Sequence, residues 1–244
     1  MGAFFTAVLF QPFLNLLIVF YNLPLHDMGL AIILLTVLVR GALWPLTHKS
    51  LHTQRAMMEL QPKLNALKEQ YKDDKEKQGK AMMELYKNEK VSPFSSCLPL
   101  LLQLPLFIGL YRALTAGLAS KSLNLLYPFV KNPGTISVMA FGFLDLSKPS
   151  IYLAVLAAVA QFFQAKMIQV KRPKPKLDGS QDEDMTAIMN KQMLYMMPAM
   201  TLFIGWKLPA GLTFYWLLTT LFMILQQAVF MQGHRHRLQG VDKV

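Results

Sequence analysis

Long apolar segments with very few charged residues are the feature that most constrains this chain. A helix needs about 20 mostly apolar residues to cross roughly 30 Å of hydrocarbon. Five segments approach that length: residues 28–46, 93–118, 150–168, 192–207 and 208–231. Because lipid offers backbone groups no hydrogen bonds, such segments form helices. The pattern predicts an all-α integral membrane protein, a helical bundle with five spans.

Polar segments separate these spans and indicate their orientation. Residues 47–92 hold ten Lys or Arg, residues 171–191 hold five, and three more follow Met231. Loops rich in Lys and Arg remain on the cytoplasmic side of a membrane. We therefore expect three cytoplasmic segments, with residues 119–149 as an extracytoplasmic loop. These three are a helical hairpin at 47–92, a flexible loop at 169–191 and a basic tail at 232–244.

The N-terminal segment, residues 1–27, is apolar but irregular. Pro12 lies within it, and proline is expected to break a helix. We expect an N-terminal interfacial helix from Pro12 to Tyr21, with Phe13, Phe20 and Tyr21 at the headgroup boundary and the N-terminus outside. The segment lacks the pattern of a cleaved secretory signal, so we expect it to be retained. Alternatively, residues 3–21 span the membrane and the N-terminus lies inside.

The first arm of the expected hairpin carries an apolar seam. Leu60, Leu64, Leu67 and Tyr71 recur at alternating spacings of four and three. A turn follows at residues 73–75, after which a second arm returns with further apolar residues. The pattern predicts two helices packed on each other, and contact with a partner is an additional hypothesis.

Charge and composition exclude several functions. The net charge of +11 lies mostly in loops beside apolar spans, where it suits anionic membrane lipids better than a specific nucleic acid. A single cysteine, Cys97, excludes an intramolecular disulfide and a cysteine metal cluster. The sequence contains no phosphate-binding glycine loop and no catalytic cluster in the spans. We expect no enzymatic activity, cofactor or metal.

Arg40 is the residue that requires an explanation. It lies about 4.5 Å past the centre of the first apolar segment, at 1.5 Å per residue. An arginine at the centre of a spanning helix costs about 2.5 to 3.5 kcal/mol, and no span contains a carboxylate that could pair with it. We expect a hydrated cavity around Arg40. The alternative is a side chain that snorkels to the cytoplasmic headgroups.

Polar residues on other spans are candidates to line that cavity. Each alone usually joins helices through hydrogen bonds, but together with Arg40 they predict a polar groove. The candidates are Thr36, Gln103, Gln161, Gln164 and Thr219. The short fourth segment favours a locally thinner bilayer, which lowers the barrier to a polar segment that crosses.

Several long strings resemble the YidC/Oxa family of membrane protein insertases, from about Gln11 to Gly233. They are GLAIILLTVLVRGALWPLT around Arg40, LQPKLNALKEQY in the hairpin, VSPFSSCLPLLLQLPLFIGLYRAL in the second span and LPAGLTFYWLLTTLFMILQQ in the fifth. The resemblance implies a five-span core with a cytoplasmic hairpin. It also implies a groove open to cytoplasm and lipid.

The resemblance also implies roles for individual residues. Arg40 matches the groove arginine of the family, and Gln164 resembles a polar groove residue of the third span. Tyr215 and Trp216 fall where relatives have aromatic residues that contact the inserting segment, although Trp216 replaces a common tyrosine. We expect a bacterial short form without the large extracytoplasmic domain of some members or the lipoprotein cysteine of others.

The expected function is therefore that of a membrane protein insertase or chaperone in the bacterial cytoplasmic membrane. Its expected partners are nascent membrane proteins, the ribosome, signal-recognition components and the Sec translocon. A small-solute transporter or channel with an anion site at Arg40 is the alternative from another class. A purely structural subunit is a third possibility.

Overall fold

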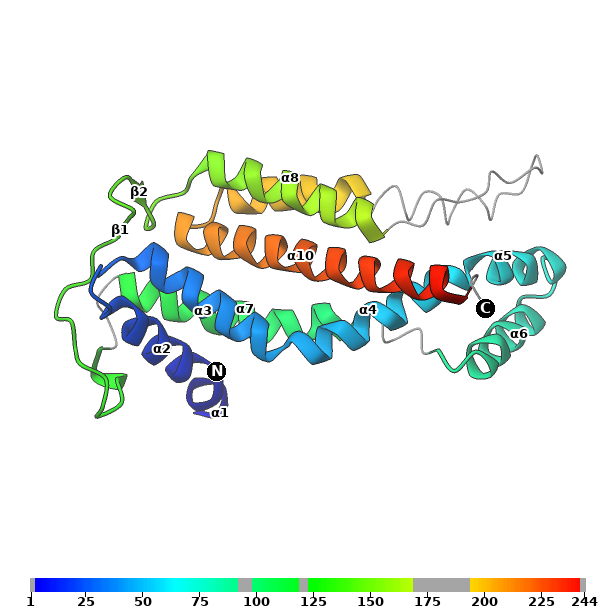
Figure 1. Ribbon diagram of the computed structural model, residues 1–244, viewed down its shortest axis with the longest axis horizontal. Coiled ribbons are helices and arrows are strands. Elements are labelled where there is room, and N and C mark those ends of the chain that lie inside the picture. Colours follow the sequence, from blue (N-terminus) through cyan, green and yellow to red (C-terminus); the bar gives the residue numbers. More distant parts are fainter. Residues whose placement is uncertain (1–2, 92–97, 119–122, 169–193, 242–244) are drawn as a thin grey trace. The chain divides into compact units, whose positions relative to one another are not determined.

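The computed structural model describes residues 3–91, 98–118, 123–168 and 194–241, nearly all of which outside residues 123–149 are helical (Figure 1). The chain divides into two compact units. The first unit comprises Met1–Trp44, Leu100–Gln161 and Pro198–Met223, and the second comprises Pro45–Pro99, Phe162–Met197 and Ile224–Val244.

The N-terminal helix is continuous across Pro12, so the expectation of a break there is wrong. Helix α1 (Ala3–Phe5) leads into a π-helical turn (Thr6–Phe10) and then α2 (Gln11–Tyr21), with Pro12 in the first turn of α2. A proline fits that position because the first N–H groups of a helix have no intrahelical partner. The wider π-turn before it accommodates the ring of Pro12 without ending the helix.

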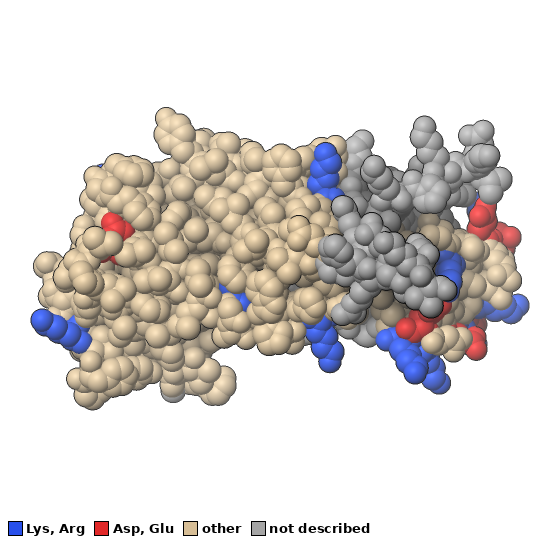
Figure 2. Space-filling view, in the orientation of Figure 1, with Lys and Arg blue, Asp and Glu red and all other residues tan. Residues whose placement is uncertain are grey.

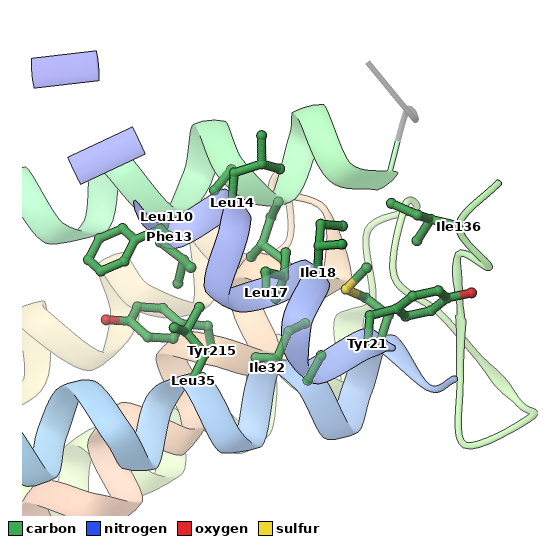
Figure 3. Packing of buried hydrophobic residues seen from close by; sticks show 14 of the residues in the cluster. Phe13, Leu14, Leu17, Ile18, Tyr21, Ile32, Leu35, Leu110, Ile136 and Tyr215 are labelled. Atoms are coloured by element: carbon green, nitrogen blue, oxygen red, sulfur yellow. The ribbon is translucent and has the colours of Figure 1, made fainter. Parts of the chain in front are cut away.

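Helix α2 packs into the protein core and buries two of its own aromatic residues, Phe13 and Tyr21, both expected at the headgroups. Phe13 and Tyr21 are buried beside fully buried Leu14 and Leu17, as the close view of this packing shows (Figure 3). Helix α2 contacts α3, and Leu9 and Phe13 pack against Gly109 of α7. Both rings are therefore in contact with protein: Phe13 packs against Gly109 of α7, and the Tyr21 hydroxyl accepts a hydrogen bond from the Ser137 N–H of the loop at 2.9 Å. Their depth relative to the headgroups stays a prediction.

Helix α3 (Met28–Ala42) ends earlier than the segment 28–46. Asp27 caps its start by accepting a hydrogen bond from the Leu30 N–H at 2.9 Å. Pro45 accounts for the early end, since it has no N–H to donate to the Gly41 carbonyl and its ring would clash with that group. Helix α4 (Trp44–Glu59) follows directly.

The other apolar segments also form helices. Helix α7 (Leu98–Leu118), helix α8 (Ile151–Ile168) and a helix at Leu194–Gly205 lie within the segments 93–118, 150–168 and 192–207. Helix α10 (Ala210–Val241) continues beyond residue 231 through most of the expected tail. Helix α7 keeps Pro105 in its interior, which is more common in membrane helices than in soluble ones.

Among the described residues, Ala210–Gln232 is a single helix long and apolar enough to cross a membrane, and the bent pair Met28–Ala42 and Trp44–Gln70 would provide a second. Three shorter apolar helices accompany them: Thr6–Tyr21, Ile151–Met167 and Leu194–Gly205. On the face drawn in Figure 2, few charged side chains lie over the helices of the first unit, whereas they gather over α5 and α6.

The segment expected as an extracytoplasmic loop is partly folded. It contains a short 3₁₀ turn (Leu123–Leu125) and a two-stranded antiparallel ribbon of β1 (Met139–Ala140) and β2 (Leu144–Asp145). Its apolar side chains join the core of the first unit: Val130, Ile136, Ala140 and Leu146. This loop therefore belongs to the packed structure of that unit.

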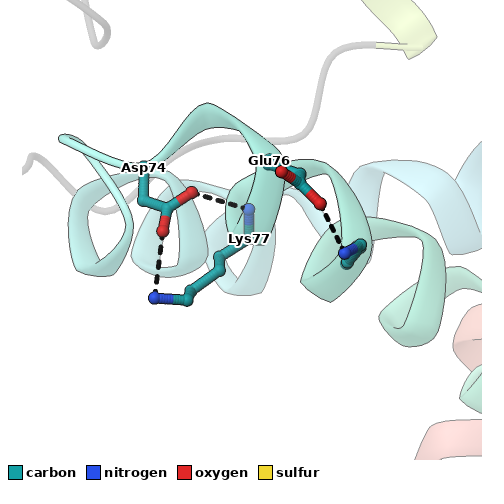
Figure 4. A network of polar contacts seen from close by, with 4 residues as sticks. Asp74, Glu76 and Lys77 are labelled. Atoms are coloured by element: carbon teal, nitrogen blue, oxygen red, sulfur yellow. Dashed lines mark hydrogen bonds and ion pairs between the residues drawn. The ribbon is translucent and has the colours of Figure 1, made fainter.

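The second unit contains two helices at the position of the expected hairpin, α5 (Gln61–Gln70) and α6 (Lys75–Asn88). Leu60 and Leu64 of the seam are buried. Asp74 caps α6 through the Lys77 N–H and pairs with the Lys77 ammonium, each at 3.0 Å (Figure 4). These hydrogen bonds hold the pKa of Asp74 below its usual value. Cys97 and residues 169–191 lie outside the described residues.

Candidate functional site

Arg40 lies in the last turn of α3, on the face that packs into the first unit. Met28, Ile32 and Thr36 form the buried stripe that leads to it at spacings of four, and Leu35 lies three residues after Ile32. Such spacings keep residues on one helix face. The Arg40 side chain is only 6% exposed, so its guanidinium does not extend to the surface as the snorkelling alternative requires.

The Arg40 guanidinium has a neutral partner. Its Nη2 donates a hydrogen bond of 2.6 Å to Oε1 of Gln103 on α7. Its Nε is buried and has no hydrogen-bond partner among residues 3–91, 98–118, 123–168 and 194–241. Within the described part of the chain no carboxylate forms an ion pair with Arg40. Among the residues that the structure describes, the site thus holds a buried cation with unused hydrogen-bonding capacity and no compensating charge.

Tyr215 and Trp216 of α10 occupy different surroundings. Tyr215 is 3% exposed and belongs to the core cluster, which also contains Leu35 of the helix that carries Arg40. Figure 3 shows Tyr215 beside Leu35 of α3. The Trp216 ring is half-buried and meets Phe107 of α7 edge to face, with centroids 5.8 Å apart. In this structure, therefore, Tyr215 belongs to the Arg40 surroundings and presents little surface to an incoming chain.

Two of the candidate threonines are buried in the first unit. The Thr36 hydroxyl donates to the Ile32 carbonyl of its own helix at 2.7 Å. Thr219 lies one turn beyond Tyr215 on α10, and in the described part of the chain its hydroxyl has no hydrogen-bond partner. An unpaired buried hydroxyl carries a desolvation penalty that water or a ligand can relieve. Thr219 is thus a second unsatisfied polar group in the unit that contains Arg40.

The two candidate glutamines of α8 belong to different units. Gln161 accepts a hydrogen bond from Thr201, which joins α8 to the helix Leu194–Gly205. This is the ordinary role of a polar residue between membrane helices. Gln164 is half-buried and belongs to the second unit.

Sequence reasoning did not single out Arg112, a second basic residue within an apolar helix. Its guanidinium lies over the Phe10 ring, 5.7 Å from the ring centroid, and the side chain is exposed. A complete count of the basic residues within the spans would have identified it. Phe10 could not have been identified as its partner, because the contact depends on how the N-terminal helix packs against α7.

Comparison with known proteins agrees with this architecture. The family model described as 60Kd inner membrane protein matches residues 19–237. Two proteins named membrane protein insertase YidC, from Shewanella frigidimarina and Shewanella loihica, are each 39% identical over 217 residues, or 89% of this chain. A third, from Shewanella halifaxensis, is 37% identical over the same length. The chain spans 36% of the length of these relatives.

These observations define a multi-pass helical protein of the inner membrane. The chain belongs to the 60Kd inner membrane protein family, which is the YidC/Oxa family that the sequence resembles.

Proposed function

We propose that this chain inserts other proteins into the inner membrane. The observation that carries the proposal is Arg40, a buried cation whose described contacts include a neutral glutamine and no carboxylate. The names of the relatives support the same activity. A buried charge of this kind is expected at a site where a ligand or water completes its interactions.

In the proposed mechanism, the hydrophilic flank of a client enters the bundle near Arg40. The unsatisfied Nε of Arg40 and hydroxyl of Thr219 replace part of the hydration that the flank loses. Acidic groups of the client gain most, because hydrogen bonds to ionised partners are roughly twice as strong as neutral ones. Gln103 holds the guanidinium in place without neutralising it.

The hydrophobic segment of the client then moves into lipid. Its transfer from water contributes about 25 cal/mol for each Å² of apolar surface buried. This term supplies the driving force, so the proposal requires no nucleotide hydrolysis, enzymatic chemistry or bound cofactor. Tyr215 helps to shape the polar site, and Trp216, Gln161 and Gln164 contact the client during this transfer.

The topology predicted from the sequence for the five spans, the hairpin and the C-terminus belongs to the same mechanism. Five helices span the membrane, and the α5–α6 hairpin and C-terminus lie in the cytoplasm. There the basic segments meet the ribosome, signal-recognition components or the Sec translocon, because ribosomal RNA and anionic surfaces attract clustered Lys and Arg.

An insertion assay with the purified chain in liposomes tests the proposal. The client carries one hydrophobic segment behind a flank with either two aspartates or two asparagines. We expect Arg40→Ala to reduce insertion of the acidic flank about tenfold, which corresponds to about 1.4 kcal/mol, and that of the neutral flank less. Arg40→Lys should retain part of the activity. Arg112→Ala is the matched control that removes another helix arginine.

Equal insertion of the acidic client by the wild type and Arg40→Ala would overturn the role of Arg40. Uptake of small anions by the same liposomes, lost in Arg40→Ala while insertion is absent from both, would support the transporter alternative instead.

A further inference from the structure

The turn between β1 and β2 has an unusual backbone. Phe141 has φ 54° and Gly142 has φ 79°, so both lie in the left-handed region. Glycine adopts this region easily, but a bulky side chain rarely does. We name Phe141, Gly142 and Phe143 the aromatic turn. Strained residues of this kind persist where the surrounding structure holds them and often mark functional positions.

The aromatic turn is fixed to the start of α3. Asp27 Oδ2 accepts a hydrogen bond from the Phe141 N–H at 2.5 Å, while its Oδ1 caps α3. Gly29 leaves room for the contact, since a Cβ there would lie 2.7 Å from the Ala140 Cβ. The Phe141 ring also meets Phe214 of α10 edge to face, with centroids 5.9 Å apart.

The strand that follows the turn is fixed to the start of α10. The Gly211 N–H donates to the Leu146 carbonyl at 3.0 Å, and the Ala210 N–H donates to the Lys148 carbonyl at 2.8 Å. The aromatic turn therefore lies level with the beginnings of α3 and α10, at one end of the first unit (Figure 1).

The turn presents apolar surface beyond this end of the helices. The Phe143 side chain is 78% exposed although its backbone is held by the ribbon. Nearby in the chain, Phe129 is 81% exposed and stacks on Tyr127, with ring centroids 5.5 Å apart. A water-filled exterior would give these rings no favourable contact, since exposed phenylalanine is costly in water.

We propose that the aromatic turn inserts into the boundary between headgroups and acyl chains at the end of the bundle where α3 and α10 begin. Aromatic rings concentrate at that depth in membrane proteins. The charges of the loop fit as well, because Lys148 pairs with Asp145 at 3.0 Å and the loop keeps a net positive charge that suits anionic headgroups. The turn thus anchors the loop in lipid and fixes the height of the bundle at this boundary.

Spin labels on the full chain test this anchor in vesicles of phosphatidylethanolamine and phosphatidylglycerol. Cys97 is the only cysteine in the sequence, so Cys97→Ser provides a background for single labels. One label replaces Phe143, and a control label replaces Thr135, an exposed polar residue of the same loop. For each label, the measured quantity is the ratio of its collision rate with oxygen to its collision rate with a water-soluble nickel chelate. We expect this ratio to be at least threefold higher at position 143 than at position 135.

Equal access of the chelate to both labels would overturn the proposal. Protection of the label at 143 from the chelate only after a client protein is added would also overturn it. In that case the aromatic turn would contact protein and not lipid. The anchor does not depend on insertion activity. The depth of the label at 143 is therefore measured again in the Arg40→Ala variant, which lacks the proposed groove cation but keeps the aromatic turn. An unchanged depth there separates the lipid anchor from the insertion activity.

Discussion

At the scale of single residues, Arg40 shows how a charge persists among apolar side chains. An arginine at the centre of a spanning helix costs about 2.5 to 3.5 kcal/mol, whereas a hydrogen bond to a charged group contributes about 1.5 to 3 kcal/mol. The bond to Gln103 is therefore of the right size to offset most of the cost. Because Gln103 is neutral, the field of the cation remains available to other groups.

Gln103→Glu separates stability from function. The new carboxylate should pair with Arg40, so we expect the same or higher thermal stability together with a severalfold loss of insertion of acidic clients. Gln103→Leu should instead destabilise the chain by about 2 kcal/mol, because it leaves the cation without its partner. Thermal unfolding in detergent and the liposome assay measure the two effects. If Gln103→Glu increased both thermal stability and insertion of acidic clients, Arg40 would not act by attracting the acidic groups of a client.

Asp145 predicts a pH dependence at the loop. Hydrogen bonds from the Ser147 hydroxyl, followed by those from Lys148 and the Ser147 N–H, lower the pKa of Asp145 to about 2. The pKa is depressed in the folded state, so the stabilisation is present above the unfolded value of about 3.9 and declines as the pH falls toward 2. Asp145→Asn should remove this dependence. Unfolding temperatures of both proteins between pH 6 and pH 2 test it, and identical profiles would refute it.

At the scale of elements, the sequence predicted the apolar helices well and their ends less well. Hydrophobic runs identify membrane helices because lipid leaves the backbone few alternatives. The end of α3 depends on Pro45, which the apolar run included. The continuity of the N-terminal helix depends on the π-turn at Thr6–Phe10, and no composition or periodicity indicates such a turn.

Two glycines of α3 offer a matched comparison. A Cβ at Gly29 would lie 2.7 Å from the Ala140 Cβ, whereas a Cβ at Gly41 would meet nothing within 4 Å. We expect Gly29→Ala to destabilise the chain by about 1 to 3 kcal/mol through overpacking. Gly41→Ala should be neutral or stabilise it by up to about 1 kcal/mol through helix propensity. Unfolding in detergent measures both, and similar effects would show that β1 does not constrain α3.

At the scale of the whole molecule, the candidate site was only partly predictable. The sequence correctly singled out Arg40 as unpaired with any acid in the spans, because a charge within an apolar run is conspicuous. It could not assign Gln103 as the partner, nor Gln161 to Thr201, since those pairings depend on which helices become neighbours. The burial of Tyr215 likewise results from the packing of α10 against the core.

The N-terminal helix affects the topology of the whole chain. Leu9 lies against Gly109 of α7, and Leu17 lies against Gly117, so the helix follows α7 in the same direction. We expect it to be embedded beside α7, with the N-terminus on the cytoplasmic side. A protease-sensitive tag on the N-terminus of the protein tests this, in cells or in oriented vesicles. The measurement is the side of the membrane from which protease cleaves the tag. Cleavage from the extracytoplasmic side would restore the interfacial placement.

The hairpin should serve delivery more than folding. Deletion of residues 50–90 removes α5 and α6 with most of α4 and leaves the described core of the first unit intact. We expect a larger loss of client insertion than of thermal stability. A variant that exchanges the exposed pair Lys80 and Glu76 is the control, because it preserves the ion pair seen in Figure 4. Unchanged insertion after the deletion would exclude a role for the hairpin.

The two oxygens of Asp27 have an evolutionary consequence. One begins a helix and the other holds a left-handed aromatic residue more than a hundred positions along the chain. A substitution at position 27 therefore disturbs both places at once. Lineages that lose this acid should also have changed the residue at position 141, so the two positions are expected to vary together.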